Sequence, residues 1–321
     1  MNPKLKLIEV SDYTKFNEIL DGRVKTLHPI IHAGILADKN RASHINQLSH
    51  LKTNPIDLVI VNLYPFEKTI NKTSIETKCI ENIDIGGPSL IRGAAKNYKS
   101  VVAVTSPNQY DELIAEANKN KNCISSNFSK KLATEAFKHT AYYDTIIANW
   151  FDKHNEIYQS DNITIPFKKV NNLRYGENPH QKAAIFSLGN NEVKKISGKD
   201  LSYNNIVDLE IAFELANNFK KSSCVIVKHG NPCGVALDNK QVNAYKKALE
   251  CDRVSAFGGI VAFNKKLDEQ TSVEILKIFT EVIIAPEFSL RAKELLLKKK
   301  NLILIKYTNK IPANKISIKS T

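Results

Sequence analysis

The chain has 321 residues, enough for two domains that each bury a core, and its 42% hydrophobic and 25% charged residues are ordinary for a globular protein. No stretch has the long apolar run of a bilayer span, so we expect no membrane partner. The formal net charge is +13, but no basic stripe alternates with aromatic side chains, so we expect anionic small molecules as partners and no nucleic acid.

The five cysteines are an odd number, lie far apart in the chain and form no Cys-x-x-Cys pair. This usage favours a reducing compartment and provides no zinc motif. The opening residues Met-Asn-Pro-Lys-Leu-Lys lack the apolar segment of a signal peptide. We therefore expect a cytoplasmic protein that requires no metal.

Arginine is scarce, since only six of the 46 basic residues are arginine. Three of the six lie inside dense polar motifs, at Arg23, Arg92 and Arg174. A planar guanidinium grips phosphate or carboxylate through two hydrogen bonds, which lysine cannot replace. We interpret these three arginines as candidate phosphate contacts.

The first segments predict a strand over residues 8–10 and a short helix that residues 11–14 cap and that ends at residue 20. The loop over residues 21–29 is too rich in donors to be a mere connection. His28 and His32 lie four apart, but Pro29 disfavours a helical His28 and no third ligand follows, so we expect no metal there.

A buried strand over residues 57–61 precedes Tyr64, which we expect near the end of that strand. The Gly86-Gly87 turn predicts a helix over residues 89–97 with free backbone amides that hold an anion beside Asp84. Arg92 and Lys96 share one face of this helix, and a solvated basic face is as good an interpretation of that pair as a site.

The rest of the first half predicts a strand over residues 101–105, a helix start capped by Ser106, a long helix over residues 129–153 and a linker over residues 159–169. Alternating strands and helices indicate a parallel, doubly wound sheet.

The second half begins with two polar loops, residues 173–181 and 198–205, followed by a helix over residues 208–219. A buried strand over residues 225–227 then ends at Lys228 and His229. Such a strand end places both groups at the edge of an α/β sheet, where these sheets bind ligands. A lysine at a strand end beside a capping histidine remains the structural alternative.

The last segments predict strands over residues 260–263 and 283–285. The small residues before the first of them, including Gly258, allow a ligand to approach closely. A lysine- and asparagine-rich tail begins at residue 298, and we expect disorder after residue 312.

Eleven segments together resemble the bifunctional family that joins aminoimidazole-carboxamide ribotide (AICAR) formyltransferase to inosinate (IMP) cyclohydrolase in purine biosynthesis. The matching segments are Ser11-Asp-Tyr-Thr14, Asp21-Gly-Arg-Val-Lys-Thr-Leu-His-Pro29, Asn62-Leu-Tyr-Pro-Phe66, Ile83-Asp-Ile-Gly-Gly87, Ala94-Ala-Lys-Asn97, Arg174-Tyr-Gly-Glu-Asn-Pro-His-Gln181, Ser202-Tyr-Asn-Asn205, Val227-Lys-His229, Asn231-Pro-Cys-Gly234, Ser255-Ala-Phe-Gly-Gly259 and Ile283-Ile-Ala-Pro286.

The resemblance implies an α/β protein with a methylglyoxal-synthase-like, doubly wound first domain over residues 1–165, for the cyclohydrolase. It implies a partial cytidine-deaminase-like second domain over residues 166–321, for the first half of the formyltransferase. The deaminase zinc is not expected, because Pro232-Cys233 lacks the second cysteine of that signature. Homodimers are also expected from the family.

The resemblance further implies two reactions: formyl-tetrahydrofolate formylates AICAR to FAICAR, and ring closure with loss of water gives IMP. His229 is the expected base and Lys228 the expected electrostatic partner of formyl transfer, while Lys25, Tyr64, Asp84 and Lys96 are expected around ring closure. The expected substrate-binding residues are Arg174, Tyr175, Asn205, Gly258, Glu281, Arg23, Thr26, Gly86, Gly87 and Arg92.

Two departures from the family pattern concern the ends of the sequence. Only ten residues precede Ser11, where the family has a first strand and phosphate-binding loops, and the second repeat of the formyltransferase is not reached. We therefore interpret the chain as a fragment. An inactive remnant that keeps only its fold and dimer surfaces is the alternative to an enzyme.

Overall fold

The computed structural model describes residues 6–154, 162–187 and 193–308. The chain divides into two compact units, Met1–Pro166 and Phe167–Thr321, one residue after the boundary expected from the sequence. Among the described residues, no helix is both long enough and apolar enough to cross a membrane.

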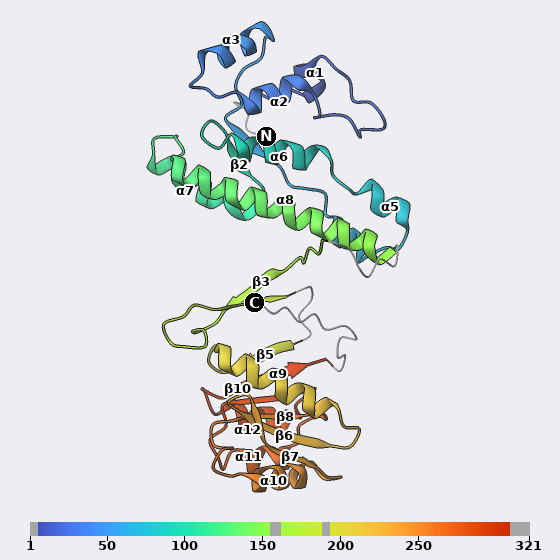
Figure 1. Ribbon diagram of the computed structural model, residues 1–321, viewed down its shortest axis with the longest axis vertical. Coiled ribbons are helices and arrows are strands. Elements are labelled where there is room, and N and C mark those ends of the chain that lie inside the picture. The colour runs from blue at the N-terminus through green and yellow to red at the C-terminus, as the bar shows by residue number, and fades with distance from the viewer. Residues whose placement is uncertain (1–5, 155–161, 188–192, 309–321) are drawn as a thin grey trace. The chain divides into compact units, whose positions relative to one another are not determined.

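Unit 1 is mostly helical, and its longest helix, α8, runs along it (Figure 1). Its elements are α1 (Val10–Thr14), α2 (Pro29–Leu36), α3 (Ala42–His50), β1 (Leu58–Ile60), α4 (Phe66–Ile70), α5 (Glu76–Glu81), α6 (Gly86–Lys96), β2 (Val102–Val104), the 3₁₀ turn η1 (Pro107–Gln109), α7 (Tyr110–Lys119) and α8 (Ser126–His154).

The core of unit 1 forms where α2, α6 and α8 pack on the β1–β2 pair. These two strands are parallel, as the sequence predicts. Within the described residues of unit 1, they form a two-stranded sheet. Val59 of β1 is buried, but Leu58 and Ile60 are 41% and 48% exposed. The prediction of a strand buried throughout was therefore wrong for β1, because only one of its faces meets the helices.

The start of unit 1 differs from the sequence-based expectation. Residues 8–10 form no strand, and Val10 already belongs to α1. That helix ends at Thr14 rather than at residue 20, because Lys15 takes a left-handed conformation with φ 56°. The Thr14 hydroxyl donates to the Val10 oxygen at 2.8 Å and accepts the Phe16 amide at 3.3 Å, which closes the last turn.

One predicted helix start in unit 1 is confirmed, at Ser106, and His28 lies outside a regular helix, as Pro29 indicated. His28 lies outside α2 as its N-cap, with its Nδ1 accepting the Ile30 amide at 3.2 Å and Pro29 in the first turn. Ser106 forms a capping box with Gln109 at the start of η1. Helix α6 begins earlier than predicted, at Gly86.

Unit 2 is built on a six-stranded mixed sheet with the order β5-β10-β9-β8-β6-β7, and β3 and β4 form a separate antiparallel pair. Its elements are β3 (Lys168–Asn172), β4 (Ala184–Ser187), β5 (Val193–Ser197), α9 (Tyr203–Asn217), β6 (Ser223–Lys228), β7 (Asn231–Leu237), α10 (Gln241–Cys251), β8 (Ile260–Phe263), α11 (Glu269–Ile275), β9 (Val282–Ala285), α12 (Leu290–Leu297) and β10 (Ile303–Tyr307).

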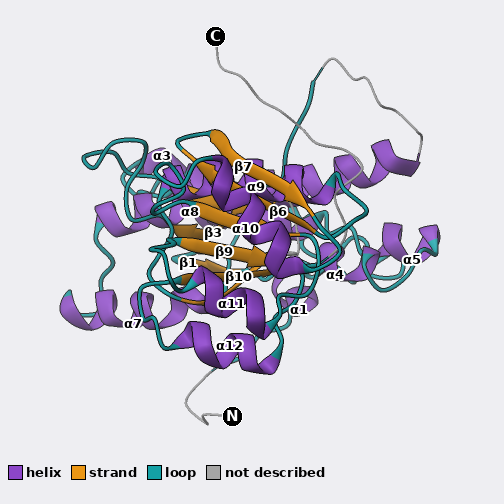
Figure 2. Cartoon of the chain, turned by 90° about the horizontal axis from the view of Figure 1, so that it is seen from below, coloured by secondary structure: helices purple, strands orange, loops and turns teal. Residues whose placement is uncertain are grey.

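Helices cover both faces of this sheet, so its central strands are apolar on both sides (Figures 1 and 2). Val225 and Val227 of β6 pack in a cluster with Ala212 and Ala216 of α9. Ile226 packs in a second cluster with residues of α10, α11 and α12. The predicted buried strands over residues 225–227, 260–263 and 283–285 are confirmed as β6, β8 and β9.

The chain reverses directly after β6, which the sequence-based interpretation did not anticipate. Strand β7 pairs antiparallel with β6, Lys228 opposite Asn231, through a two-residue turn of His229 and Gly230. Both turn residues have positive φ, 54° and 75°, as type I′ hairpins require. Pro232 is tolerated in β7 because this strand lies at the edge of the sheet.

One further expectation for unit 2 needs correction. Helix α9 begins at Tyr203 rather than at residue 208, because Ser202 and Asn205 form a capping box. The tail after residue 298 contains β10, which is buried between β9 and β5. The expected disorder after residue 312 lies outside the described residues.

Candidate functional site

One edge of the unit 2 sheet gathers most of the residues expected for formyl transfer. Strand β6 runs antiparallel to β8, and β8 runs parallel to β9, so the end of β6 meets the starts of β8 and β9. This arrangement places Lys228 and His229 at the same edge as Gly258 and Glu281. The edge therefore combines the carboxyl end of β6 with the amino ends of β8 and β9.

Lys228 is held against the turn before β8. Its Nζ donates to the backbone oxygen of Phe257 at 2.6 Å, next to Gly258. Gly258 has φ 76° and donates its amide to the Phe279 oxygen at 2.7 Å. The ammonium group thus has a defined position beside a turn where the backbone is open to a ligand.

His229 is exposed and stands in the left-handed region, which is uncommon for residues other than glycine, although asparagine, aspartate and histidine adopt it more often than the rest. The carboxylate of Asp208 on α9 accepts the amides of His229 at 3.2 Å and Gly230 at 2.6 Å. Two hydrogen bonds to a charged group therefore stabilise the turn that presents the imidazole.

A polar cluster surrounds Arg174 at the same edge. Its Nη2 donates to Asn205 Oδ1 at 3.3 Å and lies 3.6 Å from Glu281 Oε1. Its guanidinium carbon is 5.3 Å from the centre of the Tyr175 ring. Asn205 is buried and its Oδ1 also accepts the Ser202 amide at 3.0 Å, so it joins the cap of α9 to Arg174.

Sequence reasoning missed two residues of this site. Lys199 lies 2.7 Å from Glu281 Oε1, closer than Arg174 does. Asp208 holds the hairpin turn. A carboxylate in the first two turns of a capped helix was a visible signal for Asp208, but Lys199 is one of many lysines and nothing nearby marks it.

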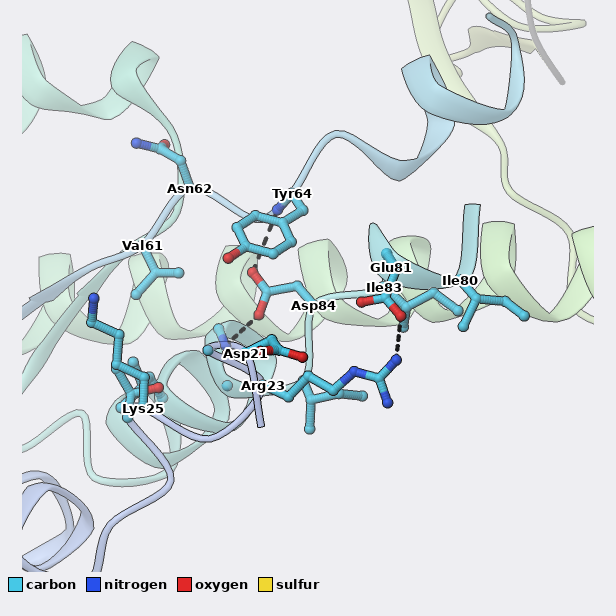
Figure 3. Close-up of a pocket in the computed structure, with 16 residues that line it drawn as sticks. Asp21, Arg23, Lys25, Val61, Asn62, Tyr64, Ile80, Glu81, Ile83 and Asp84 are labelled. Atoms are coloured by element: carbon cyan, nitrogen blue, oxygen red, sulfur yellow. Dashed lines mark hydrogen bonds and ion pairs between the residues drawn. The ribbon is translucent and has the colours of Figure 1, made fainter. Parts of the chain in front are cut away.

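Unit 1 contains a hollow of about 570 Å³ between the loop after α1, the end of β1 and the start of α6. Figure 3 shows Lys25, Tyr64 and Asp84 around it. The structure brings together here seven of the residues predicted for cyclisation: Arg23, Lys25, Thr26, Tyr64, Asp84, Gly86 and Gly87.

Asp84 caps the start of α6 (Figure 3). Its Oδ1 accepts the Gly87 amide at 2.7 Å, and its Oδ2 accepts the Tyr64 amide at 3.4 Å. A Cβ on Gly87 would lie 2.6 Å from Asp84 Oδ2, so only glycine permits this approach. The expectation that the Gly87 amide is free for a ligand was wrong, since Asp84 already occupies it.

Two cations near this hollow have carboxylate partners. Arg23 forms an ion pair with Glu81, and Lys25 Nζ lies 3.2 Å from Glu18. Exposed pairs of this kind contribute little stability and exchange readily. Both side chains can therefore leave these partners for an anionic ligand.

Arg92 and Lys96 do not line this hollow. They line a second one, of about 760 Å³, together with His32, Lys130 and Phe137. Lys96 follows Gly86 by ten residues of α6, which is about 15 Å along the helix axis. In a single copy of this chain, the structure therefore does not bring Lys96 and Arg92 into the hollow that Asp84 lines.

No group of three or more histidine, cysteine, aspartate and glutamate side chains able to hold a metal is found within the described part of the chain. His28 is the N-cap of α2 and His32 lies within that helix. The Nδ1 atom of His28 accepts the backbone amide of Ile30.

Comparisons with known proteins give matches along the chain. A family model described as MGS-like domain matches residues 2–89, and one described as AICARFT/IMPCHase bienzyme matches residues 94–321. The crystal structure of ForH covers 44% of this chain and 74% of its own chain, at 29% sequence identity and a TM-score of 0.39.

Curated relatives named bifunctional purine biosynthesis protein PurH match almost the whole chain. The protein of Prochlorococcus marinus (strain MIT 9515) is 46% identical over 96% of this chain and 62% of its own length. The protein of Thermoanaerobacter sp. (strain X514) is 47% identical over 94% of this chain and 61% of its own length. The chain thus spans about three fifths of the length of these relatives. Because the bienzyme model matches more than half of it, the chain belongs to the AICARFT/IMPCHase bienzyme family.

Proposed function

We propose that this chain belongs to an enzyme of the last two steps of purine biosynthesis. Unit 2 contributes to formyl transfer from formyl-tetrahydrofolate to AICAR, and unit 1 contributes to closure of FAICAR to IMP. The observation that carries the proposal is the gathering of Lys228, His229, Gly258, Arg174 and Glu281 at one edge of the unit 2 sheet.

Formyl transfer requires attack of the AICAR amine on the formyl carbon of the folate. His229 accepts the proton that the amine loses, and Lys228 stabilises the negative charge that develops on the formyl oxygen. The bond from that carbon to the folate nitrogen then breaks, that nitrogen takes up the proton that His229 had accepted, and tetrahydrofolate leaves. The 2.6 Å bond from Lys228 to the Phe257 oxygen supports this role, because it directs the ammonium to the turn beside Gly258.

The cluster around Arg174 binds the ribotide. Its guanidinium offers a planar fork for the phosphate, while the Tyr175 ring and the buried Asn205 hold its orientation. Glu281 lies close enough to accept hydrogen bonds from the ribotide once a ligand displaces its cations.

Ring closure joins the carboxamide nitrogen of FAICAR to its formyl carbon and releases water. Tyr64 and Asp84 orient the carboxamide and move protons, and Lys25 provides a cation for the anionic ribotide. Arg23, Thr26, Gly86 and Gly87 complete the binding surface of the hollow. Arg92 and Lys96 are left out of this assignment because they line the other hollow.

The wider assignments follow from the family. We propose a homodimer located in the cytoplasm, with folate as cosubstrate and no metal in the chemistry. The cyclohydrolase part corresponds to residues 1–165 and the first half of the formyltransferase to residues 166–321. The PurH names of the relatives support this reading.

Ligand binding by the purified chain tests the proposal. AICAR at millimolar concentration should raise the melting temperature of the wild type, and Arg174→Gln should abolish that increase. Arg253→Gln, a change at an exposed arginine outside the cluster, should not. In the chain or in a longer form of it, Lys228→Met and His229→Asn should each slow formyl transfer by about 100-fold or more.

The inactive-remnant alternative predicts different results. A remnant would melt at the same temperature with and without AICAR, and would transfer no formyl group. Wild-type transfer rates after Lys228→Met would contradict the mechanism even if AICAR binds.

A further inference from the structure

The hydroxyl of Tyr143 lies against the turn that carries Asp84. Tyr143 belongs to α8 and is buried, with 8% of its surface exposed. Its hydroxyl accepts the backbone N–H of Asp84 at 2.9 Å and donates to the backbone oxygen of Asn82 at 3.2 Å. One side-chain oxygen thus satisfies two backbone groups on either side of Ile83.

The position of this hydroxyl is itself well defined. The Tyr143 ring packs edge-on against Phe66, with 6.4 Å between ring centres, in a buried cluster with Cys79 and Trp150. A phenol keeps its proton at neutral pH and can donate to Asn82, and burial raises the pKa of Tyr143 further above its ordinary value.

The Asp84 carboxylate depends on the backbone that Tyr143 holds. Both of its oxygens accept amides, from Gly87 and from Tyr64, and those two residues line the hollow of unit 1. A shift of the turn would move the carboxylate relative to Tyr64. Small misplacements of a reacting group lower catalytic and binding efficiency strongly.

We propose that Tyr143 is a positioning residue: its hydroxyl holds residues 82–84 so that the Asp84 carboxylate faces the purine ribotide bound in unit 1. This inference rests on the proposed function of unit 1. Tyr143 does not line the hollow, so it acts through Asp84 rather than by touching the ligand.

The test compares Tyr143→Phe with Tyr142→Phe in the full chain. Phenylalanine keeps the ring of Tyr143 and removes only the hydroxyl. Tyr142 is the neighbouring residue of α8, and its hydroxyl donates to Glu67 at 3.1 Å rather than to the Asp84 turn. For each protein, amide hydrogen exchange of residues 82–87, the dissociation constant for IMP and the melting temperature are measured.

Tyr143→Phe should speed exchange of the Asp84 amide and weaken IMP binding, each by about tenfold, while Tyr142→Phe changes neither. Unchanged exchange in Tyr143→Phe would overturn the inference. Faster exchange with wild-type IMP affinity would also overturn it, because Tyr143 would then only stabilise the fold. Absence of IMP binding by the wild type would contradict the proposed function, and the exchange data would still show whether Tyr143 holds the turn.

Discussion

The carboxylate of Asp208 accepts the backbone amide of His229 at 3.2 Å, and this contact joins α9 to the hairpin turn between β6 and β7. The same carboxylate accepts the Gly230 amide at 2.6 Å. His229 needs such support because a side chain at positive φ costs about 1–2 kcal/mol relative to its preferred conformations. The candidate base of the formyl transfer site thus stands in a backbone conformation that a second residue stabilises.

The first prediction concerns the coupling between Asp208 and His229. Asp208→Ala should lower the free energy of unfolding by about 1–2 kcal/mol, because two amides lose a charged acceptor. The loss should be about the same when residue 229 is glycine, since His229→Gly keeps both backbone amides and removes only the separate strain of a side chain at positive φ. Urea unfolding of both single variants and the double variant measures this coupling. An Asp208→Ala loss near zero in both backgrounds would show that the contact does not stabilise the turn conformation.

The second prediction concerns the contact between β7 and α10 at Gly234. A Cβ at this position would lie 1.9 Å from the backbone oxygen of Ala248, which cannot move without displacing the helix. Gly234→Ala should therefore lower the free energy of unfolding by about 3 kcal/mol or more. Gly230→Ala is the matched control, because nothing lies within 4 Å of its added Cβ and only its φ of 75° is unfavourable.

Gly230→Ala should lower the free energy of unfolding by about 1 kcal/mol, which is the strain of one alanine in the left-handed conformation. Thermal unfolding of both variants provides the comparison. Equal losses would mean that β7 and α10 move apart enough to admit the added Cβ, because Gly234 does not have a positive φ.

The strand that ends at Lys228 could be predicted from sequence because its apolar run is buried on both faces and turn residues follow it. The cap at Ser106 could be predicted too, because a serine followed by a proline is a local signal of a helix start. By contrast, the antiparallel hairpin could not be predicted, because a proline such as Pro232 normally indicates that a segment is not a strand. Strand β7 can contain Pro232 only because β7 is the outermost strand of the sheet.

Other parts of the site depend on contacts between distant segments, which no local pattern reveals. Tyr143 and Asp84 are far apart in the sequence, yet one hydrogen bond of 2.9 Å joins them. Lys96 and Asp84 lie close in sequence, yet the length of α6 separates them. Residues that belong to neighbouring sequence motifs, such as Asp84 and Lys96, therefore do not have to line the same hollow.

The third prediction concerns acid stability at Asp238. The Lys247 ammonium, 2.7 Å away, and the Lys240 amide lower the pKa of Asp238 from 3.8 to about 2. A carboxyl with a lowered pKa in the folded state stabilises the protein above its unfolded pKa, and this contribution is lost as the pH falls from about 4 to about 2.

Asp238→Asn should therefore be less stable than the wild type at pH 5, and the difference should disappear near pH 2. Because the Lys247 ammonium that pairs with Asp238 is exposed, the difference should be small and should shrink further in high salt. Urea midpoints between pH 5 and pH 2 at two salt concentrations measure it. A difference that stays constant over this range would contradict the assignment to Asp238.

The last prediction concerns Lys199, whose Nζ lies 2.7 Å from the same Glu281 oxygen that Arg174 approaches at 3.6 Å. Lys199 neutralises Glu281 and leaves the Arg174 guanidinium available for a phosphate. Without it, Glu281 draws Arg174 closer, because a partly buried carboxylate needs a cation nearby. Lys199→Met should therefore weaken AICAR binding by about tenfold, whereas Lys199→Arg should bind nearly as the wild type does.

The control is Lys195→Met, which removes a lysine of the same charge that pairs with Asp200 at 2.7 Å instead. Calorimetric titration with AICAR compares the three variants. Equal affinities of Lys199→Met and Lys195→Met would show that net charge, rather than the Glu281 contact, determines binding. A larger loss in Lys199→Met that added salt does not remove would place Lys199 in the ribotide site, because short partly buried ion pairs are screened less than exposed ones.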